Sequence, residues 1–278
     1  MDGKERIDLQ HACAVATEAA EAAGALLRSR ASKPFEVHDK GTQGDLVTDL
    51  DLASEAEIVA RLRRAFPHHR ILSEELGELP GSGPWTWLVD PLDGTNNVAI
   101  GLGVFAVGIA LCRAELPMVA AVHDVPAAAT WSARRGGGAW GPRGPLPTRR
   151  PAVGRPPTLG WIQGHDLPRA DPRGMALKVR LEGEAKRVLH LWAPLLCWVM
   201  LARGDIDGIV AYQADSIDLQ AGLLIAQEAG VEVRNLDGDL FDGRCSVPDE
   251  RVSLVAGTPE TVEWLLGLVA GELKAFAT

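Results

Sequence analysis

Residues 87–95 read WLVDPLDGT, and this stretch decides the fold more clearly than any other part of the chain. An apolar run typical of a strand ends at Asp90. Pro91 has a fixed φ, and Gly94 allows backbone conformations that other residues rarely adopt, so a sharp turn is favoured here. Such a turn would let Asp90 and Asp93 face one site. A solvated turn at a strand end is the alternative interpretation, because Asp-x-x-Asp-Gly is common in loops.

The turned segment would place oxygen ligands beside backbone donors. The carboxylates of Asp90 and Asp93 and the carbonyl of Leu92 are hard oxygen ligands, which suit Mg²⁺. The free amides of Gly94 and Thr95 suit the oxygens of a phosphate. If the turn belongs to a site and is not a solvated loop, this segment is predicted to bind a phosphate together with Mg²⁺.

A second acidic segment lies at residues 45–51, which read DLVTDLD. It precedes a run over 52–66 in which apolar residues recur at helical spacing. Thr48 and Asp51 match a variant of the capping box, so Asp51 could serve the helix N-terminus instead of a site.

Two more acidic segments follow later in the chain. Glu74 and Glu75 come after a strand-like run over 70–73. Adjacent residues of a strand point to opposite faces, so one glutamate could enter a site while the other bonds a backbone or basic group. Asp218 opens a helical pattern over 219–229, where helix capping is the alternative to a ligand role.

These segments, in this order, resemble the inositol monophosphatase family of metal-dependent phosphatases. The resemblance covers about residues 8–257 and rests on Asp-Leu-Val-Thr-x-x-Asp, Glu-Glu, Asp-Pro-Leu-Asp-Gly-Thr and a final Asp-x-x-Ala-Gly motif. It implies two or three bound Mg²⁺ ions, because water must approach a dianionic phosphate and close carboxylates repel each other without cations.

The resemblance also implies a role for each matching residue. The metal ligands would be the carboxylates of Glu74, Asp90, Asp93 and Asp218 and the carbonyl of Leu92. Asp51 and Thr95, with Glu74, would orient or deprotonate the attacking water. The substrate would border Asp93, Gly94, Thr95, Trp192, Ala193, Ala211 and Asp218.

The expected substrate differs from that of inositol-specific relatives. Ala211 stands where those relatives carry a glutamate for the ring hydroxyls, and losing such a buried acceptor disfavours a polyol by about 1–3 kcal/mol. We therefore expect a small phosphorylated metabolite other than plain inositol phosphate. Trp192 or Tyr212 would stack on a nucleotide or aromatic leaving group, although Trp192 lies six residues before Trp198 in an apolar helix-like pattern and could be core.

The alternatives are a nucleotide phosphatase, such as one for 3′-phosphoadenosine 5′-phosphate, and a catalytically silent relative that binds a phosphorylated metabolite. No zinc-like spacing competes with magnesium, because the four cysteines are scattered. His165 and His190 are isolated and are expected to be structural. The family commonly forms homodimers, so a homodimer is an expectation here too.

Composition is typical of a globular cytoplasmic enzyme. The 278 residues are 46% hydrophobic and 23% charged, and the net charge of −9 argues against a nucleic-acid polymer as partner. No run of 18 apolar residues and no leader-like N-terminus occur, so neither a membrane partner nor export is expected. We expect reduced cysteines.

The expected fold class is α+β, with the layered α-β-α-β-α sandwich of sugar phosphatases implied by the resemblance. Residues 1–145 would form one half, carrying Asp51, Glu74 and the Asp90–Thr95 motif, and residues 146–278 the other, carrying Asp218. Both halves would form one catalytic unit, joined by a connector rich in proline and glycine over 141–157. Helices are expected near 7–30, 52–66, 168–181, 192–203, 219–229 and 258–272, and strands near 70–73, 85–89, 103–112, 117–123, 129–133, 159–163, 186–190 and 207–211. A buried helix is the alternative for 104–112.

Overall fold

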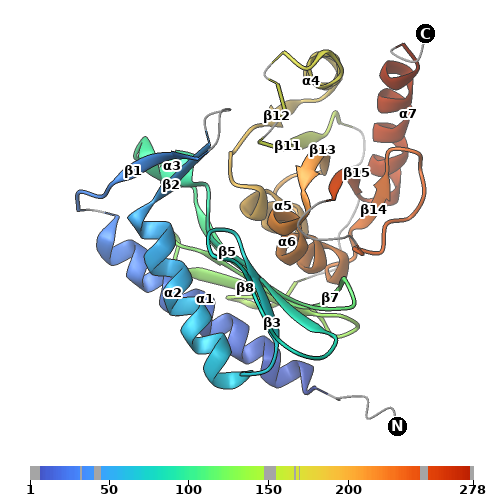
Figure 1. Ribbon diagram of the computed structural model, residues 1–278. Coiled ribbons are helices and arrows are strands. Elements are labelled where there is room, and N and C mark those ends of the chain that lie inside the picture. Colours follow the sequence, from blue (N-terminus) through green and yellow to red (C-terminus); the bar gives the residue numbers. More distant parts are fainter. Residues whose placement is uncertain are drawn as a thin grey trace.

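The computed structural model describes residues 7–31, 33–40, 45–146, 155–165, 167–168, 170–244 and 250–275. Five layers alternate along one direction, helices, sheet, helices, sheet and helices, as expected (Figure 1). The helices are α1 (Leu9–Arg30), α2 (Asp49–Ala65), α3 (Thr95–Ala99), α4 (Pro172–Glu184), α5 (Pro194–Arg203), α6 (Ser216–Glu228) and α7 (Pro259–Ala275).

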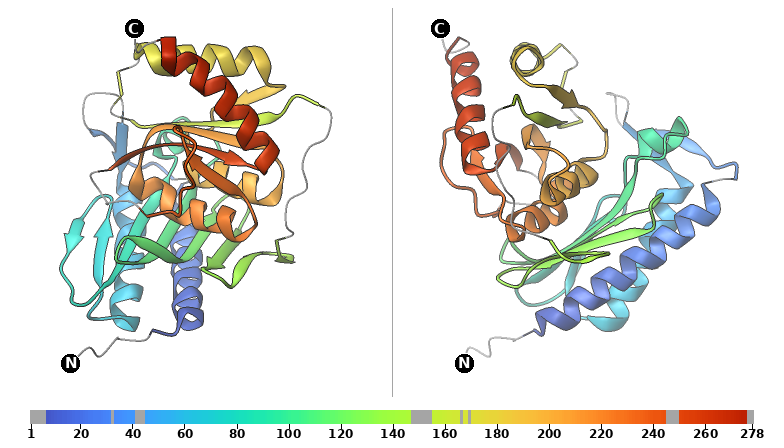
Figure 2. Two further views of the ribbon diagram at one scale, coloured as in Figure 1. Left: turned by 90° about the vertical axis from the view of Figure 1, so that its right-hand side faces the viewer. Right: turned by 180° about the vertical axis from the view of Figure 1, so that it is seen from behind.

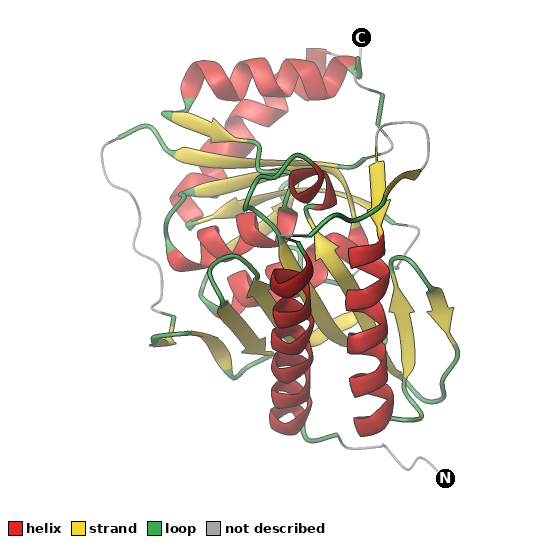
Figure 3. Ribbon diagram, turned by 90° about the vertical axis from the view of Figure 1, so that its left-hand side faces the viewer, coloured by secondary structure: helices red, strands yellow, loops and turns green. Residues whose placement is uncertain are grey.

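Helices α1 and α2 lie side by side on one face of the larger sheet (Figure 3). The Asp8 carboxylate caps α1 by accepting from the amides of Gln10 and His11. A buried row of alanines along α1 lets the helix approach the sheet closely. Thr48 and Asp51 form the capping box that the sequence predicts, so α2 begins at Asp49, three residues before the expected start.

The larger sheet contains eight strands in the order β10-β9-β8-β7-β6-β5-β3-β4. Its strands are antiparallel except for the pair β3 and β5. They are β3 (Arg70–Ser73), β4 (Gly77–Leu79), β5 (Trp85–Asp93), β6 (Ala106–Arg113), β7 (Leu116–Asp124), β8 (Ala129–Arg134), β9 (Gly138–Gly141) and β10 (Gly144–Pro145). Residues 106–113 are therefore a strand, and the helix alternative is wrong.

The second sheet has the order β12-β11-β13-β15-β14. Its strands are β11 (Thr158–Gln163), β12 (Arg187–Leu189), β13 (Gly208–Asp215), β14 (Glu232–Asn235) and β15 (Arg251–Gly257). Helices α5 and α6 lie between the two sheets, and α4 and α7 cover the outer face of the second sheet (Figure 2). The largest hydrophobic core cluster surrounds α5 and α6 and joins residues of both sheets.

The sequence pattern did not predict several short elements. A separate hairpin pairs β1 (Val37–Lys40) with β2 (Asp45–Thr48), and α3 and β4 are also unexpected. Each is five residues or fewer, which is too short for a recurring apolar pattern. The middle of the expected connector, residues 147–154, and Cys245 lie outside the described residues. The proposed boundary near residue 145 stays a prediction.

Candidate active site

The motif at residues 90–95 is a bulge at the end of β5 and not a turn that ends the strand. Asp90 pairs with Gly108 and Asp93 with Ala106, so β5 contains one extra residue between the two pairs. Such a bulge bends the strand and redirects side chains, and Pro91 fits there because it has no N–H to pair. Both carboxylates are almost fully buried, which fits a site better than a solvated turn.

Burial raises the pKa of both aspartates well above the ordinary value. For Asp90, the nearby negative charges of Glu74, Asp93 and Asp218 add to this effect. For Asp93, the amide of Leu195 opposes it by donating a hydrogen bond of 2.8 Å to Oδ2. That bond connects the bulge in β5 to the first turn of α5, about a hundred residues later in the chain.

Carboxylates from three distant segments converge beside the bulge. One oxygen each from Glu74, Asp90 and Asp218 lies within 4.8 Å of the other two. Glu74 follows β3, where its amide donates to the Val89 carbonyl at 3.2 Å, and Asp218 lies in the first turn of α6. We call Glu74, Asp90, Asp93 and Asp218 the acidic cluster.

Lys40, which the sequence argument missed, lies against this cluster. Its Nζ is 2.8 Å from Glu74 Oε1 and 2.7 Å from Glu75 Oε1. Burial alone would lower the pKa of Lys40, but the two carboxylates raise it. Glu74 and Glu75 follow the end of β3, so strand alternation does not separate them, and both reach the same ammonium. Burial raises the pKa of Glu75 to about 7, against the effect of Lys40.

Asp51 and Thr95 form a hydrogen-bonded pair at the edge of the cluster. The Thr95 hydroxyl lies 2.9 Å from Asp51 Oδ1 and 3.0 Å from the Leu92 carbonyl oxygen. The other oxygen of Asp51 accepts from the Thr48 amide at 2.8 Å, and burial raises the pKa of the carboxyl. Asp51 therefore caps α2 and contacts Thr95 at the same time, so the two interpretations of this residue are compatible.

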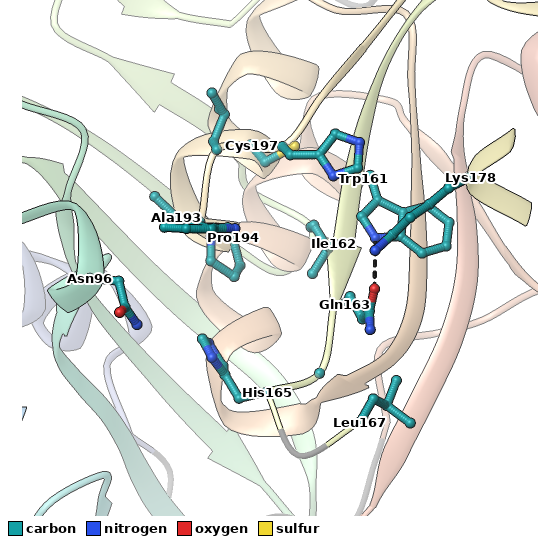
Figure 4. A pocket seen from close by; sticks show the side chains of 14 residues that line it. Asn96, Trp161, Ile162, Gln163, His165, Leu167, Lys178, Ala193, Pro194 and Cys197 are labelled. Atoms are coloured by element: carbon teal, nitrogen blue, oxygen red, sulfur yellow. Dashed lines mark hydrogen bonds between the residues drawn. The ribbon is translucent and has the colours of Figure 1, made fainter. Parts of the chain in front are cut away.

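Two cavities meet beside the acidic cluster. A small one of about 30 Å³ is lined by the acidic cluster, Leu92, Gly94, Thr95, Asn96, His165 and Trp192. A larger cavity of about 540 Å³ shares Asn96, His165 and Trp192 with it and extends to β11 and α4 (Figure 4). Ala193 and His190 also line the larger cavity. His165 and His190 thus border the site, which their isolated positions in the sequence did not indicate.

Trp192 is not a core residue, so that alternative is wrong. It lies before α5 with a φ of 52° and is 62% exposed. The side chain of Asn97 holds the preceding residue by donating to the Leu191 carbonyl at 2.7 Å. The helix-like pattern wrongly placed Trp192 in the same helix as Trp198, because α5 begins only at Pro194. Trp198 lies within α5 and is fully buried.

Ala211 and Tyr212 lie away from the open space. Ala211 on β13 is 0% exposed and belongs to the core, so the prediction that it borders the substrate is wrong. A bulge between Ala211 and Ala214 breaks the register there, which residue counting along the sequence cannot anticipate. Tyr212 is 7% exposed and stacks on Trp161 at 6.1 Å between ring centroids.

Nearly the whole chain is similar to proteins of one known family. A profile of the inositol monophosphatase family matches residues 8–272. The chain belongs to the inositol monophosphatase family. It is 31% identical over 262 residues to the inositol-1-monophosphatase of Synechocystis sp., covering 91% of each chain. It is 33% identical over 236 residues to the Nus factor SuhB of Pseudomonas aeruginosa, covering 81% of this chain and 85% of that one.

Solved structures of the family share the fold. The inositol monophosphatase of Anabaena superposes with a TM-score of 0.81 at 27% identity, over 95% of this chain and 97% of that one. The suppressor protein SuhB of Bartonella henselae gives a TM-score of 0.83 at 25% identity, over 93% and 98%. The α-β-α-β-α sandwich of sugar phosphatases is therefore the fold of this chain.

The acidic cluster has the donor chemistry of a site for hard divalent cations. Its carboxylates lie close together, those of Asp90 and Asp93 are buried, and their mutual repulsion costs free energy that a cation would remove. Lys40 supplies one positive charge to the Glu74 carboxylate of the cluster. The described residues contain no competing group of cysteines and histidines with metal-binding geometry.

Proposed function

We propose that this chain is a Mg²⁺-dependent phosphomonoesterase acting on a small phosphorylated metabolite. The convergence of Glu74, Asp90 and Asp218 within 4.8 Å, beside Asp93 and the Leu92 carbonyl, carries the proposal. Bound Mg²⁺, in two or three copies, would neutralise the phosphate and lower the pKa of a water molecule. The membership of a phosphatase family supports the same reaction class.

The residues around the cluster have distinct roles in this proposal. Glu74, Asp90, Asp93, Asp218 and the Leu92 carbonyl hold the cations, and the amides of Gly94 and Thr95 hold phosphate oxygens. The Thr95 hydroxyl orients the attacking water, and Asp51 accepts the proton that Thr95 passes on, because the pair is already hydrogen bonded at 2.9 Å.

The leaving group of the substrate would occupy the larger cavity. Trp192 stands between the two cavities, and Ala193 lies beside it, so both would contact the leaving group. An exposed indole offers a flat apolar surface instead of the carboxylate that a polyol would need. This favours a substrate other than plain inositol phosphate.

The test is phosphate release from a panel of inositol, sugar and nucleotide monophosphates, with Mg²⁺ and with excess chelator. We expect release that requires Mg²⁺ and falls about 10²–10³-fold in Asp93→Asn, because removing one electrostatic stabiliser costs that much. Asp205→Asn, at an exposed ion pair, is the matched control. Undiminished activity in excess chelator contradicts the proposal.

A second candidate is a non-catalytic binding role, favoured by the similarity to a protein named Nus factor SuhB. A preparation that binds divalent cations but releases no phosphate from any panel member would support it. The described helices include none that is both long and apolar enough to cross a bilayer. Cytoplasmic location and a homodimer remain predictions.

A further inference from the structure

The larger cavity is much bigger than a phosphate requires. Its 540 Å³ lie within the range of pockets that take whole metabolites. Asn96 lies on the side of the acidic cluster, whereas Lys178 and Gln163 lie across the cavity from it (Figure 4). The wall formed by α4 and β11 therefore faces the end of the leaving group that is remote from the scissile phosphate.

That wall carries a cation that has no close counter-anion among the residues the structure describes. Lys178, on α4, is half-buried, and its Nζ lies 5.3 Å from the centre of the Trp161 ring. Within the described ranges, no carboxylate lies within 4.0 Å of it; Asp171 acts on it from further away and is already bonded to the Gly174 amide at 2.6 Å. A partly desolvated ammonium is stabilised by an anion, so the cavity favours one here.

Gln163 and His190, which line the cavity with Lys178, offer hydrogen-bond donors and carry no negative charge themselves. Gln163 Oε1 accepts from Trp161 Nε1 at 3.3 Å, which leaves its amide nitrogen as the donor end. Burial and the charge of Lys178 lower the pKa of His190, so a neutral imidazole with one N–H faces the same space at pH 7. Glu182 lies 3.9 Å from His190 Nε2 and is itself largely exposed.

We propose that Lys178, with Gln163 and His190, forms a subsite for a second anionic group of the substrate. The substrate class is then a phosphate monoester whose leaving group ends in a carboxylate or a second phosphate. The inference rests on the proposed function, since the acidic cluster must hold the scissile phosphate. If Lys178 only packs on Trp161, its charge has no effect on substrate choice.

The test compares three open-chain substrates with Mg²⁺ present. Sorbitol 6-phosphate has a neutral far end, 6-phosphogluconate carries a carboxylate there, and sorbitol 1,6-bisphosphate carries a phosphate. Because the carbon chains and the internal hydroxyl groups match, any penalty on those internal hydroxyl groups cancels, and only the terminal group differs. We expect wild type to prefer at least one two-anion substrate, with Lys178→Met raising KM for that substrate about ten- to a hundredfold while kcat changes little.

Matched variants isolate the charge of Lys178. Lys178→Arg should restore most of the preference, and Lys186→Met, at an exposed lysine on the segment after α4, should leave it unchanged. The sorbitol 6-phosphate values should be the same in all of these proteins. Equal effects of Lys178→Met on all three substrates, or no preference in wild type, overturn the subsite. The two charged substrates distinguish a carboxylate from a phosphate as the group recognised.

Calorimetric titration of the same compounds with Ca²⁺ in place of Mg²⁺ separates the two proposals. Tighter binding of a two-anion compound that is lost in Lys178→Met supports the subsite even if no phosphate is released, in which case the phosphatase proposal fails alone. Hydrolysis of all three compounds with no effect of Lys178→Met leaves the phosphatase standing and rejects the subsite. Absence of binding and hydrolysis for these compounds, together with no phosphate release from the monophosphate panel, rejects both.

Discussion

Thr95 has a hydroxyl shared between the Asp51 carboxylate and the Leu92 carbonyl. If that hydroxyl relays a proton to Asp51, removing either group stops the same step. We expect Thr95→Val and Asp51→Asn each to lower kcat about 10²–10³-fold, and the double variant to lose hardly more than the worse single variant. Steady-state phosphate release measures this. Independent, multiplying losses would show that the two residues do not act as a unit.

Glu55 is a buried carboxylate that sequence patterns did not single out. Its Oε1 accepts from the amides of Glu75 and Leu76 at 3.1 and 3.0 Å and from the Ser73 hydroxyl. These bonds hold the segment that carries Glu74, so Glu55 is a positioning residue.

Loss of these bonds should weaken cation binding. We expect Glu55→Ala to raise the Mg²⁺ concentration for half-maximal activity about ten- to a hundredfold, the usual cost of removing support behind a metal ligand. Glu57→Ala is the matched control, because Glu57 lies on the same helix in a surface ion pair with Arg61. An unchanged magnesium requirement in Glu55→Ala would show that the segment holds its place without this carboxylate.

Helix α6 carries Asp218 in its first turn and packs against α5 one turn later. A Cβ at Gly222 would lie 2.5 Å from Trp198 Cβ, so the two helices would have to move apart. We expect Gly222→Ala to lower the free energy of unfolding by about 1–3 kcal/mol and to raise the magnesium requirement. Chemical denaturation and magnesium titration measure the two effects.

Gly183 in α4 provides the control for this substitution. Among the described residues, a Cβ built there meets no atom within 4 Å apart from its chain neighbours and the backbone of its own helix. Gly183→Ala should therefore stabilise the protein by up to about 1 kcal/mol, because alanine favours the helix. If both alanine variants were equally stable, close packing of α5 and α6 would not be limiting.

Across the whole molecule, the acidic cluster connects the larger sheet with α6. Glu74, Asp90 and Asp93 come from the larger sheet and its loops, and Asp218 comes from α6. Cations that bind only the folded arrangement stabilise it by about 2.7 kcal/mol at a hundredfold excess over Kd. We expect Mg²⁺ to raise the melting temperature by several degrees over a chelator-treated sample, and Asp218→Asn to remove most of the rise. Equal melting curves with and without Mg²⁺ would argue against a cation at this junction.

Much of this architecture could be predicted from local spacing. The long helices, the central strands and the segments that carry the acids depend on periodicity and capping within a few residues, as in α2 with its Thr48 box. The bulge in β5, the exposed position of Trp192 and the core position of Ala211 depend on neighbours far away in sequence. Short elements such as the β1–β2 hairpin, which brings Lys40 to Glu74, leave no periodic signal.

The sequence by itself determined which residues could hold cations and a phosphate, because chemical type, order and motif spacing are properties of the chain. Only the tertiary structure decided that Glu74, Asp90 and Asp218 meet and that Lys40 joins them. It also decided that Trp192 and Lys178 line one cavity. The reason is physical: burial, bulged register and contacts between distant elements arise from packing the two sheets around α5 and α6, and no local pattern encodes them.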